Sequence, residues 1–220
     1  MTDARERFDA LPKSDQEAIL EKHRDWYVHD DDWWDSVYEQ FKEDVAVLGF
    51  DIDTNVSRTV SGKPLTNHEI FFSGFSSQGD GACFNGGVGK CETVFTRLAP
   101  ILWEHWSKIE VCTASWKSRD NYYYHSNTLS FSYEFEVPNQ ITDESDLRWH
   151  VMEQLRTELE AAWDTFTGVL EAEVKGLCDK LYSDLSDEYD HLTSDESILE
   201  SLIANDQLNQ EIDEYEQASA

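Results

Sequence analysis

The chain has 220 residues and a formal net charge of −29, from 46 acidic and 17 basic side chains. Such a charge repels nucleic acids and anionic membranes, so direct binding to DNA, RNA or lipid is the least favoured class of function. No apolar run approaches the roughly 18 residues of a membrane span, and the acidic N-terminus lacks the apolar core of a signal peptide, so we expect a soluble intracellular protein.

The negative charge is concentrated in the two flanks of the sequence. Residues 1–55 carry 16 acidic and 6 basic side chains, residues 56–140 carry 8 and 7, and residues 141–220 carry 22 and 4. Acidic flanks favour attraction to a basic protein surface. The alternative is that the acidity serves only solubility or a high-salt cytoplasm.

Two helices are expected before residue 50. Ser14 and Glu17 have the spacing of a capping box and predict a helix over about 14–27. The aspartates at 30–32 precede an apolar stripe and predict a second helix over about 32–48. We interpret these aspartates as helix caps and not as metal ligands, because no second ligand group follows at a useful spacing.

Residues 50–60 predict a first strand, and residues 61–67 a turn or surface loop. Asp51 and Asp53 imitate the start of a calcium-binding EF-hand loop, but Val56 stands where that loop needs glycine. No metal is expected.

The central stretch predicts strand, loop, strand. Ile70–Phe72 and Ala82–Phe84 have the aromatic and apolar content of buried strands. Between them lie small and polar residues that fold back tightly and can point backbone N–H groups outward. We therefore expect a binding loop composed of Gly74, Phe75, Ser76, Ser77, Gln78, Gly79, Asp80 and Gly81.

A helix and a hairpin follow. Residues 91–108 have helical periodicity, and Pro100 is expected to kink or divide the helix. The alternation of polar and apolar residues over 109–117 and 127–137 predicts two half-buried strands joined as a hairpin.

The remaining chain predicts acidic helices. A continuous apolar stripe predicts a long helix over about 142–177, followed by helical segments over 177–192 and 194–204. Residues 205–220 have little apolar content and many carboxylates, and are expected to form a flexible acidic tail, either a fraying helix or a disordered segment.

These elements predict an α+β fold: a small antiparallel sheet of about four to five strands, flanked by N-terminal helices and a long acidic C-terminal helical segment. We expect one domain over residues 1–204, with helices at 14–48, the sheet core at 50–137 and the helical segment at 142–204. A chain of this size buries enough surface to fold without metal or disulfides, and no cofactor is expected.

Four cysteines, at positions 83, 91, 112 and 178, show neither C-x-x-C spacing nor the density of a secreted scaffold. They are expected to be buried free thiols.

An enzymatic alternative rests on the residues Asp80-Gly81-Ala82-Cys83-Phe84, which are similar to the signature of ovarian-tumour-type cysteine peptidases. The resemblance would make Cys83 the nucleophile and His125 or His150 its base, with Gln78 upstream. Such a thiolate needs a helix N-terminus or a cationic neighbour to lower its pKa. The glycine-rich residues after Cys83 cannot start a stable helix, so we expect no catalytic residue and keep the peptidase as an alternative.

Three stretches carry a second resemblance: RDWYVHDDDWWDSVYEQFKEDVAVLGF at 24–50, IFFSGFSSQGDGACF at 70–84 and EYDHLTSDESILESLIAN at 188–205. The central stretch contains the motif S-G-F-x-S-Q-G-D-G-A-C-F. Together they resemble a family of small phage proteins often labelled antitoxins of toxin–antitoxin systems. The resemblance implies a phage-encoded protein in the host cytoplasm that neutralises a partner protein.

We therefore expect a binding protein. Besides the loop at 74–81, the C-terminal helices offer an acidic face composed of Asp184, Asp187, Glu188, Asp190, Asp195 and Glu196. Rows of carboxylates on rigid helices can imitate the phosphates of a duplex. The expected partner is a host or phage protein with a basic surface, such as a nucleic-acid-binding or defence factor. A virion or assembly component is a further alternative.

Overall fold

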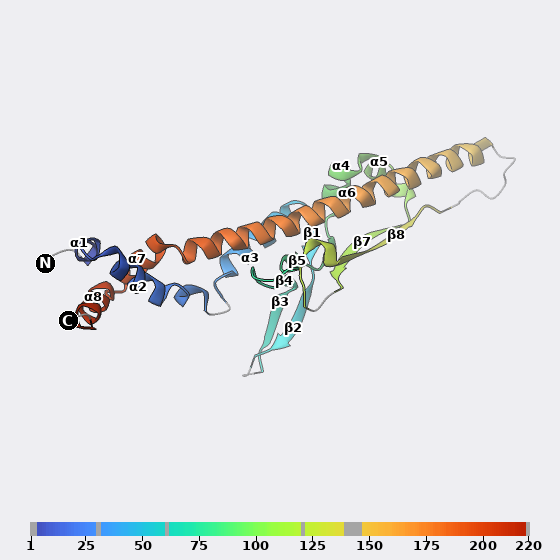
Figure 1. The fold of residues 1–220 in the computed structure, drawn as a ribbon. Helices are drawn as coiled ribbons and strands as arrows, with labels where there is room; N and C mark the ends of the chain where they lie inside the picture. The colour runs from blue at the N-terminus through green and yellow to red at the C-terminus, as the bar shows by residue number, and fades with distance from the viewer. Residues whose placement is uncertain (1–3, 30–31, 60–61, 120–121, 139–146, 219–220) are drawn as a thin grey trace. The chain divides into compact units, whose positions relative to one another are not determined.

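The computed structural model describes residues 4–29, 32–59, 62–119, 122–138 and 147–218. The fold is α+β, as the sequence predicts (Figure 1). The chain forms two compact units. We call Met1–Val37 with Asp184–Ala220 the terminal unit, and Tyr38–Ser183 the sheet unit. This division differs from the expected single domain over residues 1–204, because the helices at the two ends of the chain pack on one another around an apolar cluster of their own.

In chain order the elements are α1 (Ala4–Asp9), α2 (Lys13–His23), the 3-10 helix η1 (Trp26–Val28), α3 (Asp35–Val47), β1 (Phe50–Ile52), β2 (Thr54–Arg58), β3 (Pro64–His68), β4 (Ile70–Phe72), β5 (Ala82–Phe84), β6 (Gly86–Val88), α4 (Cys91–Leu98), α5 (Pro100–Glu104), η2 (Trp106–Lys108), β7 (Val111–Ser118), η3 (Ser126–Thr128), β8 (Leu129–Glu136), α6 (Leu147–Leu192), α7 (Asp195–Ala204) and α8 (Leu208–Ala218).

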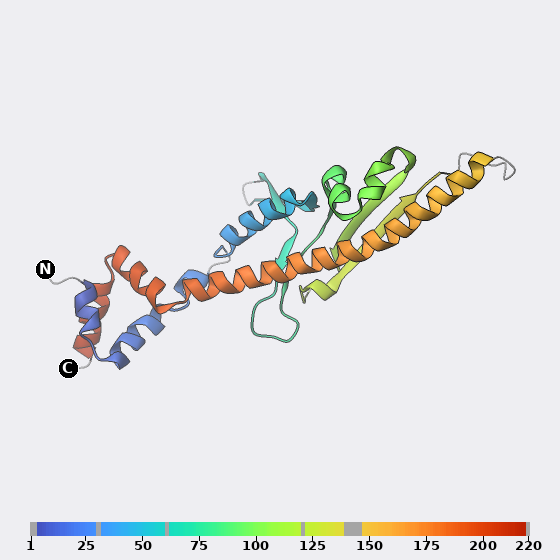
Figure 2. The same ribbon diagram turned by 90° about the horizontal axis from the view of Figure 1, so that it is seen from above.

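The main sheet is antiparallel and has four strands in the order β1-β6-β7-β8. The predicted hairpin of β7 and β8 is confirmed, with Trp116 paired to Phe131 and Ala114 to Tyr133. Because successive side chains of a strand point to opposite faces, these apolar pairs share one face of the sheet. In Figures 1 and 2 the portion of α6 within the sheet unit runs along β7 and β8.

The strand β6 lies in the glycine-rich stretch after Cys83, where the sequence predicts that no stable helix can start. It pairs with β1 on one side and with β7 on the other. A Cβ atom on Gly86 would lie 2.2 Å from the backbone oxygen of Asp51. Glycine is therefore required there, because the two strands approach too closely for any side chain.

Helix α6 is longer than predicted. It continues without a break to Leu192, because buried residues recur every three or four positions past residue 177. The recurring residues are Leu159, Trp163, Phe166, Leu170, Val174, Leu177, Leu181 and Leu185. Val151 and Val169, assigned to the same stripe from sequence, are 64% and 42% exposed. The expected helix start at 142–146 lies outside the described residues.

Aromatic side chains form the centre of the sheet unit. Phe84 of β5 meets Phe41 of α3 at 5.2 Å and Trp116 of β7 at 5.4 Å between ring centroids, both edge to face. Phe95 of α4 packs on Phe166 of α6 at 4.7 Å. These contacts join helices and strands from distant parts of the sequence, and edge-to-face rings are a favourable arrangement.

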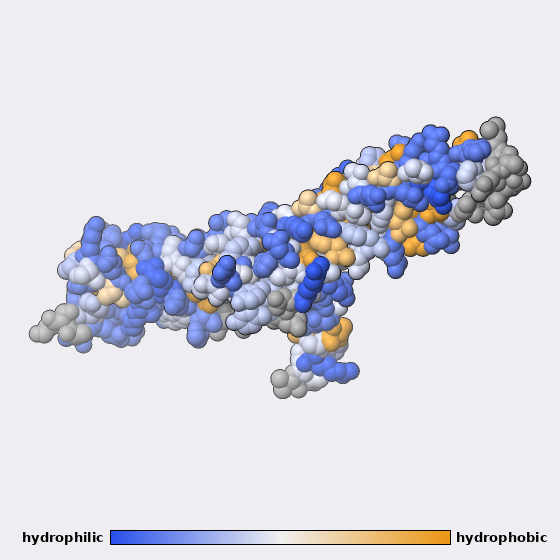
Figure 3. Space-filling model, turned by 45° about the vertical axis from the view of Figure 1, so that its right-hand side comes forward, coloured by the Kyte–Doolittle hydropathy of each residue, from blue (hydrophilic) through white to orange (hydrophobic). Residues whose placement is uncertain are grey.

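The β2–β3 hairpin projects from the sheet unit (Figures 1 and 3). The sequence predicts a loop over 61–67, whereas Pro64–His68 forms a strand paired with Thr54–Arg58. Apart from half-buried Ser57 and Asn67, the residues of both strands are exposed. Pro64 is compatible with this strand because it occupies the first position.

The terminal unit is helical. Its buried cluster joins α1, α2, α7 and α8 and consists of Phe8, Ile19, Leu20, Ile198, Leu199, Leu202, Leu208 and Ile212. Of the two expectations for residues 205–220, the disordered segment is wrong for Leu208–Ala218, which forms the helix α8. Leu208 and Ile212 are one helical turn apart and both buried, so they share the face that covers α1 and α2.

Helix starts were predicted with mixed success. Ser194 caps α7, since its side chain accepts the N–H of Ser197. The predicted capping box at Ser14 is wrong: α2 starts after Pro12, and the Ser14 hydroxyl donates to Asp15 instead. The aspartates at 30 and 31 lie outside the described residues.

Candidate protein-binding surfaces

The predicted binding loop lies between β4 and β5, which pair as expected. Within it, one oxygen of Asp80 accepts the backbone N–H groups of Ser76 at 2.8 Å and Ser77 at 2.6 Å. Two of the donors expected to face a ligand are thus satisfied by the loop's own carboxylate. This is a correction to the sequence prediction: Asp80 closes the turn, as aspartate commonly does, and leaves those amides unavailable to an anion.

Aromatic rings anchor the loop to the sheet unit. Phe75 lies 5.5 Å from the ring of Tyr182 on α6 and 4.8 Å from Phe72. Gly79 has φ +103°, and a Cβ atom there would lie 2.9 Å from the Tyr123 ring. The positive φ and the close ring both require glycine at this position.

Little of the loop remains accessible. Ser76, Ser77 and Gln78 are exposed, whereas the other predicted loop residues, Gly74, Phe75, Gly79, Asp80 and Gly81, are half-buried or buried. The loop therefore offers three adjacent exposed polar side chains, Ser76, Ser77 and Gln78. Its geometry supports a structural role more than ligand binding.

Cys83 lies in the middle of β5 and is fully buried. Burial raises the pKa of its thiol to about 11, and hydrogen bonds from Ser118 and Thr128 oppose this only in part. A protonated thiol in a strand is a poor nucleophile, because the thiolate is the reactive form. This arrangement gives the cysteine peptidase alternative no support. All four cysteines are free; Cys83 and Cys178 are buried, while Cys91 and Cys112 are half-buried.

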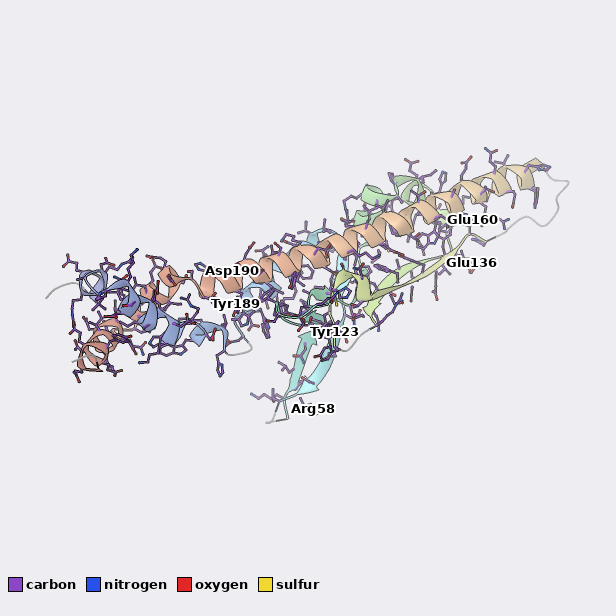
Figure 4. The ribbon with its side chains drawn as sticks, viewed as in Figure 1. Arg58, Tyr123, Glu136, Glu160, Tyr189 and Asp190 are labelled. Carbon is purple, nitrogen blue, oxygen red and sulfur yellow. The ribbon has the colours of Figure 1, made fainter. Side chains whose placement is uncertain are left out.

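The six residues of the predicted acidic face all belong to the terminal unit. Asp184, Asp187 and Glu188 are spaced three and four residues apart on α6, and so share one face. Asp187 and Asp190 are exposed, and Figure 4 labels Asp190 near the end of α6. The adjacent Tyr189 instead meets Trp33 at 5.7 Å between ring centroids.

The other two predicted residues are already paired. Glu196 accepts two hydrogen bonds from Arg5, at 3.0 and 3.1 Å. Asp195 accepts one from Arg24 at 2.9 Å. These two carboxylates connect α7 to the N-terminal helices, so part of their hydrogen-bonding capacity is used inside the unit.

Ion pairs occupy most of the basic side chains of this unit. The unit holds 23 acidic and 5 basic residues, a formal charge of −18. Arg7 pairs with Asp213 at 2.6 Å and Lys22 with Glu211 at 2.7 Å. With Arg5 and Arg24, four of the five basic residues are held internally. The outer parts of the two acidic flanks, residues 1–37 and 184–220, thus meet in one strongly negative helical unit.

Sequence reasoning missed a pair of exposed aromatic residues in the terminal unit. Trp26 and Tyr27, in the 3-10 helix after α2, are 50% and 39% exposed. Both residues fall within the helix that the sequence predicts over about 14–27. The α-helix ends at His23, so the two rings lie in the 3-10 turn that follows it. The adjacent W-Y pair followed by an aspartate run was the available signal.

The sheet unit has a hollow of about 540 Å³ between α3 and β1. Its lining includes Glu39, Lys42, Glu43, Asp51 and His68, and Lys42 pairs with Glu39. In the described part of the chain, no group of three or more potential ligand side chains is placed to hold a metal ion. Among the described helices, none has both the length and the apolar character to cross a membrane.

Comparison with known proteins gives one family. No curated protein and no solved structure matches the chain significantly. A family model described as a domain of unknown function (DUF8835) matches residues 33–195, which is 163 of the 220 residues. The match includes β1 to β8, the strands of the described residues, and the whole of α6. The chain therefore belongs to the DUF8835 family.

Proposed function

We propose that this protein binds and blocks a partner protein that has a basic surface, and that the terminal unit supplies the binding surface. The observation that carries the proposal is the charge of that unit, −18, with four of its five basic residues held in internal ion pairs. Such a surface attracts cationic partners over long range and accelerates their association.

The helices give this charge a fixed geometry. The carboxylates of α6 repeat at three- and four-residue intervals on a helix whose apolar stripe is buried. A rigid row of carboxylates can occupy a groove that normally holds nucleic-acid phosphates. The partner class is therefore a nucleic-acid-binding protein. The resemblance of residues 24–50, 70–84 and 188–205 to phage proteins labelled antitoxins supports a neutralising role inside a phage-infected host.

The test uses the full chain as bait in cells that produce it. A variant with Asp187→Asn, Glu188→Gln and Asp190→Asn removes three carboxylates from α6. The matched control, Glu92→Gln, Glu104→Gln and Glu110→Gln, removes three exposed carboxylates from the sheet unit. Capture is compared at roughly 50 and 500 mM salt, which shortens the Debye length from about 14 to 4 Å.

We expect the wild type and the control to capture the same partner at low salt, and the α6 variant to capture less of it. High salt should release the partner from all three. The purified partner should then lose nucleic-acid binding when the protein is added. The proposal would be contradicted if the α6 variant captured as much partner as the wild type, or if high salt did not release the partner.

A further inference from the structure

Next to Trp26 the terminal unit has a hollow of about 350 Å³. It is lined by Glu21, Lys22, Asp25, Trp26 and His29. All five residues belong to the segment that contains α2 and the turn of 3-10 helix after it. The hollow thus combines an exposed indole with two carboxylates.

The aromatic side of the hollow is held in place. Trp26 stacks on His23, with ring centroids 5.0 Å apart and planes 25° apart. His23 is itself buried, and its Nε2 lies 3.0 Å from an oxygen of Glu211 on α8. Tyr27 lies 6.4 Å from Trp26, and its hydroxyl accepts a hydrogen bond from Asn205 at 3.4 Å. The exposed half of the indole is therefore presented by a fixed side chain.

On the charged side of the hollow, the two other charged residues are in ion pairs, and Asp25 supplies the carboxylate that can meet a ligand. Glu21 pairs with Arg24 at 2.6 Å, and Lys22 pairs with Glu211 at 2.7 Å. Among the described residues, the carboxylate of Asp25 has no ion pair or side-chain hydrogen bond. Lys22 is directed to α8 by its partner, so the surplus charge at the hollow is negative.

We infer that this hollow receives an arginine or lysine side chain of the partner protein, with the cation against Trp26 and its charge balanced by Asp25. An aromatic face attracts guanidinium and ammonium groups, and more strongly when water is partly excluded. The carboxylate adds a charge-assisted hydrogen bond. Because the indole is held by its contact with His23 before binding, little conformational entropy of that side chain is lost when a cation enters. This inference rests on the proposed function and names the chemistry that the terminal unit recognises.

The probe is a synthetic peptide with four arginines separated by glycine and serine, and the matched peptide carries citrulline, the neutral isostere of arginine. The full chain is labelled with ¹⁵N-tryptophan, and the indole N–H signal of Trp26 is assigned as the one lost in Trp26→Phe. The arginine peptide should shift this signal saturably, and the citrulline peptide should not.

The second part of the test compares the affinity of variants of the protein for the arginine peptide. Trp26→Leu, which keeps apolar bulk without a π face, should weaken binding about fivefold, and Asp25→Asn about threefold. The controls are Glu104→Gln, which removes one exposed carboxylate, and Tyr122→Ala, which removes a ring that is 73% exposed, both in the sheet unit. Both should bind as the wild type does.

The outcomes separate the two proposals. If the α6 variant weakens binding but Trp26→Leu and Asp25→Asn do not, the site at Trp26 is overturned while the acidic binding surface stands. If none of these variants weakens binding, both proposals fail. Equal binding of the citrulline peptide would overturn the assignment of a cationic ligand.

Discussion

The carboxylate of Asp80 accepts the backbone N–H of Ser77 at 2.6 Å, within the loop between β4 and β5. The same oxygen accepts the N–H of Ser76. The Asp80 side chain thus serves the loop itself, because one of its oxygens holds two backbone amides of the same turn.

Replacing Asp80 should open this turn. Asp80→Ala removes the acceptor of two amides and is expected to cost about 1–3 kcal/mol. In hydrogen exchange followed by NMR, the amides of Ser76 and Ser77 should exchange at least tenfold faster. Asp80→Asn keeps one acceptor oxygen and should have a smaller effect. Unchanged protection of both amides in the alanine variant would show that the carboxylate does not hold the turn.

The burial of α8 makes the end of the chain part of the folded terminal unit. Ile212 has no exposed surface, so Ile212→Ala should lower the free energy of unfolding of that unit by about 2–5 kcal/mol. Gln217→Ala, at an exposed position of the same helix, should change it by less than about 0.5 kcal/mol. Urea unfolding monitored by NMR of α1 and α2 gives both values. If the two variants had equal free energies of unfolding, α8 would not be packed in the terminal unit, and residues 208–218 would be a flexible tail.

Stability should also depend on pH through Glu196. Its hydrogen bond from Arg5 lowers the pKa of Glu196 below 4.5. Because the folded state favours the charged form, this contribution is present above pH 4.5 and is lost as pH falls through the lowered pKa. The melting temperature of Glu196→Gln should therefore lie slightly below that of the wild type at pH 7, and the difference should vanish in acid. Because both side chains are exposed, salt should also reduce it. A difference that persists in acid would exclude the ion pair as its source.

Cys83 should behave as an inert core thiol. At pH 8 its alkylation by iodoacetamide should require unfolding, whereas half-buried Cys91 should react faster. The pKa of about 11 lies above the ordinary value of 9.0, so the unfolded state loses the proton first. The stabilising contribution is complete below pH 9 and declines as pH rises toward 11. Rapid alkylation of Cys83 in the folded protein at pH 8 would instead show an accessible, reactive thiol and support the peptidase alternative.

The β2–β3 hairpin should tolerate polar substitution. Val56 is 69% exposed, so Val56→Thr should change the free energy of unfolding by less than about 0.5 kcal/mol. The same substitution at Val94, which is fully buried, should cost about 1–3 kcal/mol because it buries a hydroxyl. Thermal denaturation of both variants makes the comparison. A large loss at Val56 would mean that the hairpin packs against another part of the protein.

Local patterns in the sequence predicted much of the sheet unit. The alternation over 109–117 and 127–137 predicted β7 and β8, and Pro100 marks the boundary between α4 and α5. These succeeded because strand alternation and proline act through neighbouring residues alone. The strand β6 was missed because glycine has low strand propensity, and only the close approach of β1 explains why glycine is present.

By itself the sequence determined the α+β class, the position of most elements and the placement of negative charge in the two flanks. Only the tertiary structure decided that the outer parts of these flanks join in one helical unit, that α8 packs there through buried residues, and that the Asp80 carboxylate accepts amides of its own loop. The reason is physical: element type follows from short-range periodicity, whereas the association of α1 with α8 depends on apolar side chains roughly 200 residues apart, and no local pattern encodes which faces will meet.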